Sequence, residues 1–271
     1  MKEFIMINSL NQNVVSTDSP SVERLLKKIE PIILSGLGLI IVGEQGTERE
    51  YIASRINELS GRENHVFSKY DCNYNYQYLS EKIIFGSEDL ILTGVEINRG
   101  MLEKISKGSI YFENIESMSP PLISRLIREV ENGHFRRVGG VEDIPLNVRF
   151  LAGMDSHIVN SLDTKTSELI HRLFPIIVNF PPLRERKEDI WYYLMKIIEK
   201  YSFTRVMNDT IISDKFAQFV LNYSWPGNFQ ELNNVIKSTI INAGWKTIRV
   251  EHLPNYLFQQ YFGKGQGFAI N

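Results

Sequence analysis

Residues 39–50 read LIIVGEQGTERE. An apolar run opens the stretch, a turn with two glycines follows, and residues 51–56 continue with apolar side chains at helical spacing. Strand, tight loop and helix are the context that a phosphate-binding P-loop requires. The P-loop pattern G-x-x-x-x-G-K-[S/T] has a glycine and a lysine where this chain has Glu48 and Arg49. The stretch therefore has the frame of a nucleotide site without all of its chemistry, and the alternative is an ordinary strand–loop–helix connection.

The two departures change the electrostatics of such a loop. A P-loop holds phosphate because successive backbone N–H groups and the start of the helix form a nest for anions. Glu48 adds bulk and negative charge where glycine would let the backbone approach the ligand, and Arg49 carries its charge on a planar fork instead of a compact ammonium group. The loop positions that we assign to cofactor binding are Gly43, Glu44, Gly46, Thr47, Glu48, Arg49 and Glu50.

Composition excludes several classes of protein. The chain has 271 residues, 43% of them hydrophobic and 23% charged, which is ordinary for a globular protein of one or two domains. A net charge of −2 gives no overall basic field for nucleic acid. No apolar run approaches the roughly 18 residues of a membrane-spanning helix, and the single cysteine, Cys72, excludes an internal disulfide and fits a reducing cytoplasm. The histidines lack the spacing of metal ligands, so we expect no metal site.

Further strand-like runs alternate with helical patterns and predict an α/β fold with a parallel sheet. These runs cover residues 66–70, 108–115 and 148–153. Helices are expected over residues 22–29, with Ser21 as the N-cap, and from Pro120 onward. Residues 90–94 are unusually apolar and are expected to form an exposed loop.

The pattern changes after about residue 187, where amphipathic helical segments follow one another without a strand between them. They cover residues 191–201, 213–221 and 229–243, and predict a small all-helical second unit. The expected domains are an N-terminal extension (1–18), an α/β domain (19–187), a helical subdomain (188–258) and a flexible tail (259–271), whose glycines are typical of linkers.

Several motifs occur in an order that one family shares. They are PPLRERKEDI at residues 181–190, WPGN at 225–228 and GHFRRVGG at 133–140. Over residues 19–254 the chain resembles the AAA+ domain of bacterial enhancer-binding proteins, which activate sigma-54 RNA polymerase. The resemblance implies a P-loop AAA+ fold, a three-layer αβα sandwich around a parallel sheet, with a small all-helical lid after it. It also implies rings of subunits that bind nucleotide between them, and loops that remodel the polymerase when ATP is hydrolysed.

The chain departs from that family at further positions of the ATPase site. Glu113 and Asn114 replace the Asp-Glu pair of the Walker B motif, and Asp155 replaces the asparagine that ends the sensor strand. Among the arginines that act on a neighbouring subunit, Arg172 alone is retained as a candidate arginine finger. Gln230 stands where the family has a lid arginine and is the remaining candidate for cofactor binding.

These losses act on different parts of one reaction. Phosphoryl transfer depends almost entirely on the placement of charge, and removal of one positioned group typically lowers the rate ~10²–10³-fold. We therefore expect a pseudo-ATPase, to which no catalytic residue is firmly assigned and for which ATP or ADP with Mg²⁺ is at most a weak ligand. Such a protein would regulate transcription through protein–protein contact or as a nucleotide-sensing module.

Two alternatives stay open. Arg49 and Glu113 could substitute for the lysine and the aspartate, which would give a weakly active ATPase that remodels sigma-54 RNA polymerase. The loop could instead bind another anionic nucleotide, such as a signalling dinucleotide, through Arg49, Arg184 or Arg186. The last two arginines could equally pair with carboxylates and hold the junction between the subdomains.

The family's polymerase-contact loop, G-A-F-T-G-A, is replaced by LILTGV at residues 90–95. Its candidate partner-binding residues are Leu92, Thr93 and Gly94, and the alternative is an ordinary apolar loop packed on a neighbour. The resemblance implies other AAA+ subunits as partners, in a homo- or hetero-oligomer, and sigma-54 RNA polymerase as a further partner. No basic helix-turn-helix follows Pro254. We therefore expect either a chain trimmed at its glycine-rich tail, with DNA bound through a segment absent from this sequence, or a protein that acts without DNA binding of its own.

Overall fold

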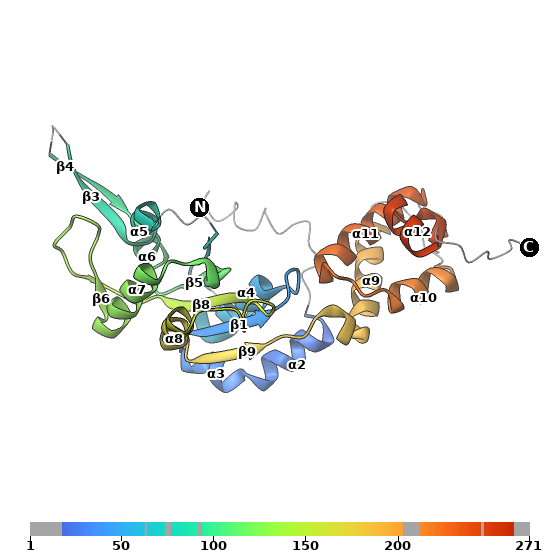
Figure 1. Cartoon of the computed structure of the whole chain (residues 1–271), viewed down its shortest axis with the longest axis horizontal. Helices are drawn as coiled ribbons and strands as arrows, with labels where there is room; N and C mark the ends of the chain where they lie inside the picture. The colour runs from blue at the N-terminus through green and yellow to red at the C-terminus, as the bar shows by residue number, and fades with distance from the viewer. Residues whose placement is uncertain are drawn as a thin grey trace, which may run out of the picture. The chain divides into compact units, whose positions relative to one another are not determined.

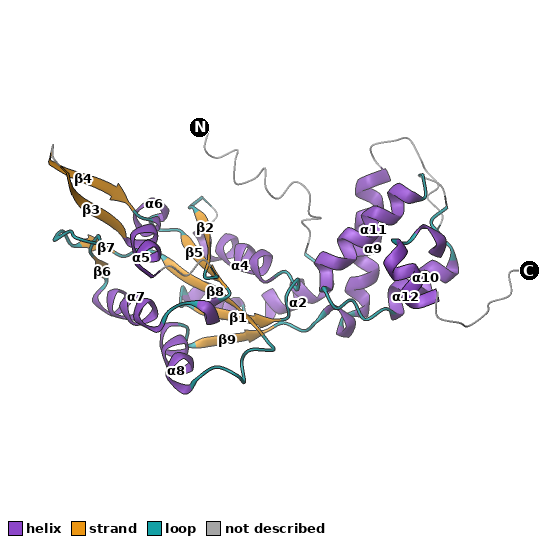
Figure 2. Ribbon diagram, turned by 45° about the horizontal axis from the view of Figure 1, so that its top comes forward, coloured by secondary structure: helices purple, strands orange, loops and turns teal. Residues whose placement is uncertain are grey.

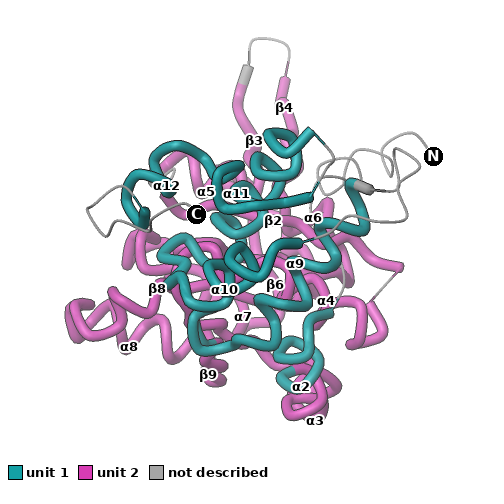
Figure 3. The backbone as a smooth tube through the Cα atoms, turned by 90° about the vertical axis from the view of Figure 1, so that its right-hand side faces the viewer, with its two compact units in different colours: residues 1–25, 181–271 teal, residues 26–180 magenta. Residues whose placement is uncertain are grey.

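The computed structural model describes residues 18–62, 64–73, 77–91, 94–202, 212–244 and 247–262. The chain divides into two compact units, which Figure 3 colours separately. One unit is Leu26–Phe180, and the other is Met1–Leu25 together with Pro181–Asn271. The first unit holds the sheet and the P-loop-like stretch, and the described part of the second is helical.

A five-stranded parallel sheet forms the centre of the Leu26–Phe180 unit (Figure 1). In spatial order its strands are β2 (Phe67–Asp71), β5 (Ser109–Glu113), β8 (Arg149–Asp155), β1 (Leu39–Gly43) and β9 (Ile176–Asn179). β1 lies inside the sheet between two neighbours and is buried at all five positions, which explains its continuous apolar run. The predicted strands are thus confirmed, and all of them run in the same direction.

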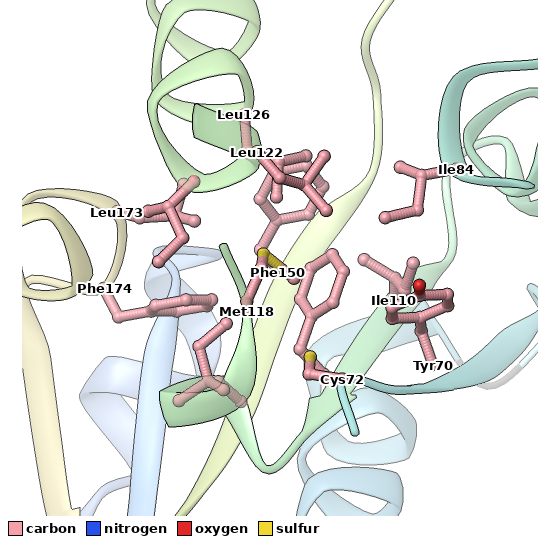
Figure 4. Close-up of a cluster of buried hydrophobic side chains, with 14 of the residues drawn as sticks. Tyr70, Cys72, Ile84, Ile110, Met118, Leu122, Leu126, Phe150, Leu173 and Phe174 are labelled. Atoms are coloured by element: carbon pink, nitrogen blue, oxygen red, sulfur yellow. The ribbon is translucent and has the colours of Figure 1, made fainter. Parts of the chain in front are cut away.

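Helices cover both faces of this sheet (Figure 2). On one face α4 (Arg49–Asn57) packs against β1, β5 and β8. On the other face lie α5 (Gln77–Phe85), α6 (Met101–Ile105), α7 (Pro120–Asn132) and α8 (Thr164–Leu173). The alternation of side chains along each strand separates the two faces. Ile110 and Phe150, for example, point toward the layer of α5, α6, α7 and α8, where Figure 4 shows Ile110 near Ile84 and Phe150 near Leu122.

Two helices precede β1 in the chain, α2 (Pro20–Lys28) and α3 (Glu30–Ser35). The start of β8 is held to α3 and to Leu37 after it. The buried Arg149 donates hydrogen bonds to the carbonyl oxygens of Ile32, Ile33 and Leu37, at 3.2, 2.8 and 3.1 Å. Burial lowers the pKa of Arg149 to about 10, and the carbonyls at the end of α3 offset part of the cost of burying its charge.

An antiparallel hairpin projects from this unit where a loop was predicted (Figure 1). It consists of β3 (Gly86–Ile91) and β4 (Gly94–Arg99). The prediction of a loop at residues 90–94 is therefore wrong at both ends, because Leu90 pairs with Val95 and Ile91 with Gly94. Sequence reasoning missed these strands because Leu90, Val95 and Ile97 face solvent; Leu90 is 91% exposed. Leu92 and Thr93 lie outside the described residues.

The turn at residues 136–143 packs on this hairpin. It links two short antiparallel strands, β6 (His134–Phe135) and β7 (Ile144–Pro145). Within the turn, Arg137 is buried and forms ion pairs with Glu88, Glu103 and Glu142, at 2.9, 2.7 and 3.0 Å. These pairs join the hairpin, α6 and the turn.

The helical unit confirms the three predicted amphipathic segments, with slightly different bounds. Its helices are α9 (Lys187–Ser202), α10 (Asp214–Asn222), α11 (Asn228–Asn242) and α12 (Asn255–Phe262), with 3-10 turns at Leu183–Glu185 and Val250–His252. The WPGN turn is part of its core, since Trp225 is buried and donates to the Val220 carbonyl oxygen at 2.8 Å. Asn228 Oδ1 accepts a hydrogen bond from the Leu183 N–H at 2.8 Å, so the two sequence motifs meet.

The start of α2 differs from the prediction. The helix begins at Pro20, one residue before the predicted cap Ser21. The capping side chain is instead Ser19, whose hydroxyl accepts from the Val22 N–H at 3.4 Å, because proline needs no partner at the first helical position. Across the described ranges we find no helix with the length and apolar character needed to cross a membrane.

Candidate functional site

The P-loop-like turn connects the end of β1 to the start of α4. Gly43 ends the strand, and a Cβ atom there would lie 2.7 Å from Thr47 Oγ1 and 3.1 Å from the Phe180 carbonyl oxygen, so a side chain has no room. Thr47 Oγ1 donates to the Glu44 carbonyl oxygen at 2.6 Å, and Gly46 takes a left-handed conformation with φ of 80°. The turn has therefore kept the close packing of a phosphate-binding loop.

Glu48 stands in a conformation that suits glycine. Its φ and ψ are 68° and 28°, in the left-handed region, at the position of the second glycine of the P-loop pattern. A side chain in that region costs roughly 1–2 kcal/mol because Cβ approaches the following carbonyl oxygen. The loop therefore has the backbone conformation of a P-loop at residue 48, although glutamate fits that conformation less well than glycine.

Replacing Glu48 with glycine is expected to give a protein about 1 kcal/mol more stable than the Glu48→Ala variant, because glycine adopts this conformation without strain. Denaturant unfolding of both variants measures the difference. Alanine is the matched control, since it removes the carboxylate and keeps the Cβ atom. Equal free energies of unfolding would contradict the strained conformation of residue 48.

Arg49 is the first residue of α4, and its side chain is only 5% exposed. The guanidinium turns across the base of the loop and donates to the Gly43 carbonyl oxygen at 3.1 Å. Its other terminal nitrogen forms an ion pair with Glu113 Oε1 at 2.6 Å and lies 3.5 Å from Asn114 Oδ1. The positive charge that could hold an outer phosphate is therefore engaged by this chain's own carboxylate.

Lys69 of β2 extends this contact toward the surface. Its ammonium lies 4.0 Å from Glu113 Oε2 and 2.6 Å from Glu50 Oε2. Glu50 is the residue after Arg49, so both of these charged residues lie at the start of α4. Two cations and two carboxylates alternate around the mouth of the loop.

Asn114 follows β5 in a left-handed conformation, with φ of 54° and ψ of 52°, which asparagine tolerates better than most residues. Its side-chain amide donates to Asp71 Oδ1 at 3.1 Å while its oxygen faces Arg49. A carboxylate at this position would repel Asp71. The asparagine is thus matched to its two neighbours, one an acceptor and the other a donor.

Asp155 ends β8 directly beside Gly43 in the sheet. Its carboxylate accepts the His157 N–H at 2.9 Å and lies 2.9 Å from the ring Nδ1 of the same residue. The Asp155 N–H donates to Glu116 Oε1 at 3.2 Å, and burial raises the pKa of Glu116. The sensor position therefore places a second acidic group next to the loop.

The other predicted site residues lie elsewhere. Arg172 of α8 forms an exposed ion pair with Glu131 of α7 at 2.6 Å. Gln230 belongs to α11 in the helical unit, and Gly94 starts β4 with φ of 136°. Arg186, a candidate for nucleotide contact, is buried and pairs with Asp189 at 2.6 Å, which favours the alternative of a structural role.

The residues around the loop do not suit a nucleotide with its metal ion. The cation for the phosphates and the carboxylate for the metal form an ion pair with each other, and the amide of Asn114 can neither accept a proton nor carry negative charge. Within the described ranges no three acidic, histidine or cysteine side chains gather in a way that could hold a metal ion.

Sequence reasoning missed four of the contacting residues. Lys69, Asp71, Glu116 and His157 all lie on or just after strands of the sheet. Asp71 and Glu113 are register partners at the ends of parallel strands, and such ends are where ligand sites collect in α/β folds. A polar residue directly after a predicted strand was thus a usable signal for Asp71. No comparable signal existed for His157 or Glu116.

Two family models match the chain. The sigma-54 interaction domain matches residues 15–179, and the AAA+ ATPase lid domain matches residues 184–267. The transcriptional activator RocR of Bacillus subtilis (strain 168) is 30% identical over 239 residues, 87% of this chain and 52% of RocR. The regulatory protein AtoC of Escherichia coli (strain K12) is 31% identical over 256 residues, 93% of this chain and 55% of AtoC. The chain therefore spans about half the length of these relatives.

Solved structures of NtrX from Brucella abortus share the fold. One of them superposes with a TM-score of 0.76 at 22% identity, covering 98% of this chain and 61% of NtrX. A crystal structure of NtrX in complex with ATP gives a TM-score of 0.74 at 21% identity, covering 93% of this chain and 60% of NtrX. With the family models, these matches show that the chain belongs to the sigma-54 interaction domain family and has an α/β P-loop AAA+ fold followed by a helical lid.

Proposed function

We propose that this chain is the AAA+ part of a transcription regulator that acts through protein–protein contact and does not hydrolyse ATP effectively. The observation that carries the proposal is the ion pair between Arg49, which is buried, and Glu113, which is mostly buried. It joins the side chain that should hold the outer phosphates to the one that should order the metal. Family membership and the two curated relatives, a transcriptional activator and a regulatory protein, support the role in transcription.

The expected loss of turnover follows from the chemistry of phosphoryl transfer. The reaction needs a cation at the transferred phosphate, a metal ion and a residue that orients the attacking water. In this chain Arg49 and Glu113 neutralise each other, and Asn114 donates to Asp71. Each missing positioned group typically lowers the rate ~10²–10³-fold, so the combined loss leaves no useful rate.

Steady-state ATPase assays test this proposal. We expect no release of phosphate above the protein-free control, with dilute protein or with concentrated protein that would favour a ring. Mg²⁺-dependent turnover that the Arg49→Ala substitution abolishes would contradict it.

The partners that we propose are other AAA+ subunits and sigma-54 RNA polymerase. The match to the sigma-54 interaction domain supports this choice. The hairpin of β3 and β4 supports it as well, because Leu90 and Val95 are paired, Ile97 shares their face, and all three side chains are exposed.

A hairpin variant tests the polymerase contact. Val95→Ser combined with Ile97→Ser is expected to change the melting temperature by no more than about 2 °C, because both side chains are exposed. It is expected to weaken binding to purified sigma-54 RNA polymerase about tenfold if this face is at the contact. Leu34→Ser, at an exposed apolar position of α3, is the control. Unchanged binding by the hairpin variant would exclude this face.

The second candidate function is a weakly active ATPase that remodels sigma-54 RNA polymerase. It is favoured by the position of Glu113, which still ends β5 beside the loop and could release Arg49 to a phosphate. In that case Glu113→Gln would abolish turnover. Binding of another anionic nucleotide is separated from both by calorimetry with a nucleotide panel, in which heat of binding without hydrolysis would identify the ligand.

A further inference from the structure

Four charged side chains around the loop form a series of ion pairs, which we term the ion-pair circuit. It runs from Arg49 to Glu113 (2.6 Å), from Glu113 to Lys69 (4.0 Å) and from Lys69 to Glu50 (2.6 Å). Glu50 follows Arg49 in α4, so the two ends of the series lie on the first turn of the same helix. It connects α4 with the carboxyl ends of β5 and β2.

The charges within the circuit balance. Two cations face two carboxylates, and every member has an oppositely charged partner within 4.0 Å. Burial is unequal: the Arg49 and Glu113 side chains are 5% and 14% exposed, whereas those of Lys69 and Glu50 are 39% and 46% exposed. Removing one member of a buried pair leaves an uncompensated charge, which is strongly destabilising, while a solvated pair contributes little. The Arg49–Glu113 pair should therefore contribute more to stability than the Lys69–Glu50 pair.

The circuit also closes the loop. Arg49 Nη1 donates to the Gly43 carbonyl oxygen at 3.1 Å, and these two residues flank the turn on either side. Between them Glu48 is held in the left-handed region, a conformation that persists only where its surroundings impose it. The hydrogen bond to Gly43 and the ion pair to Glu113 supply that constraint from the residue next in sequence.

We infer that the ion-pair circuit is a built-in substitute for nucleotide. It holds the loop, and the ends of β1, β5 and β2 around it, in one conformation at every concentration of nucleotide. A ligand can shift a conformational equilibrium only through different affinities for its states, and here phosphate and metal would have to displace contacts that already satisfy both charges. This inference rests on the proposed function and adds that nucleotide does not switch the shape of this unit.

A double-mutant cycle on Arg49 and Glu113 tests the inference in the whole chain. Arg49→Ala is expected to lower the melting temperature by roughly 10 °C, because it leaves the mostly buried carboxylate of Glu113 with only Lys69, at 4.0 Å, as a cationic partner. Arg49→Ala combined with Glu113→Ala is expected to lower the melting temperature no more than Arg49→Ala alone, because the poorly compensated carboxylate is then absent. Arg49→Lys is the milder variant if the alanine variant does not fold; one ammonium cannot reproduce both contacts of the fork, so a partial loss is expected.

Two controls separate the circuit from general effects of charge removal. Lys69→Ala, in the exposed half, and Arg172→Ala, in an exposed pair on α8, are each expected to change the melting temperature by about 2 °C or less. If Arg49→Ala melts within that same range, the circuit does not hold the loop and the inference is overturned.

Hydrogen exchange of residues 39–50 distinguishes this inference from the proposed function. In the unchanged chain, MgATP in large excess over the protein should leave the exchange of these amides unaltered, because only a ligand that binds the folded state slows exchange. Slower exchange without phosphate release would overturn the built-in substitute and leave the proposed function standing. Phosphate release would overturn the proposed function itself.

Discussion

The triple variant Glu48→Gly, Arg49→Lys, Glu113→Asp is expected to bind MgATP. Glycine at 48 allows the backbone to approach the phosphates, and lysine at 49 offers a compact charge. Aspartate at 113 shortens the carboxylate by one methylene, so it no longer reaches residue 49 as Glu113 does at 2.6 Å. Ligand at ~100 times its dissociation constant stabilises a protein by about 2.7 kcal/mol, which corresponds to a rise in melting temperature of roughly 5–10 °C.

Its control keeps Arg49 and changes residues 48 and 113 in the same way. The two proteins then differ at a single side chain, and thermal melting with and without MgATP compares them directly. We expect a rise for the lysine protein alone. If neither protein gains stability, the arginine is not what excludes nucleotide, and the acidic groups at Asp155 and Glu116 become the next positions to change.

Arg186→Ala is expected to destabilise the helical unit by about 3–5 kcal/mol. Arg186 pairs with Asp189 at 2.6 Å, and both side chains are almost fully buried. Asp189 also accepts from the Ser19 hydroxyl at 2.9 Å and from the Ser21 N–H at 3.0 Å, so the carboxylate anchors the start of α2. Without its arginine that charge stays buried and uncompensated.

Denaturant unfolding, followed by hydrogen exchange in α9, measures the loss. The matched control is Arg24→Ala. Arg24 of α2 forms an exposed pair with Glu188, which precedes Asp189 in α9, so its removal should leave the free energy of unfolding unchanged within error. Equal stability of the two variants would mean that the Arg186–Asp189 pair contributes nothing.

The parallel sheet could be predicted because burial leaves a direct trace in the sequence. β1 and β8 are buried along nearly their whole length and therefore read as continuous apolar runs. The β3–β4 hairpin gives no such trace, since β4 is exposed at all of its positions. The apolar residues of β4 are not packed in a core, so the sequence of this strand cannot be distinguished from that of an exposed loop.

The site could be predicted only in part, because a sequence motif identifies which residues belong to the site and does not identify the residues that they contact. The loop, Glu113, Asn114 and Asp155 were found from their places in the motifs, and the structure brings them together. That Arg49 turns back to Glu113 depends on the register of β1, β8 and β5, which no local pattern encodes. The hydrogen bond that Asn114 donates likewise depends on Asp71 of the neighbouring strand, which no local pattern identifies as its partner.

The strand order has a consequence for biosynthesis. Leu39 of β1 pairs with Leu151 and with Ile176, each more than one hundred positions later in the chain. At about 5–20 residues per second, a ribosome would take several seconds to deliver those neighbours. Throughout that delay the nascent apolar segment has both edges unpaired, which is the state in which strands aggregate or recruit chaperones.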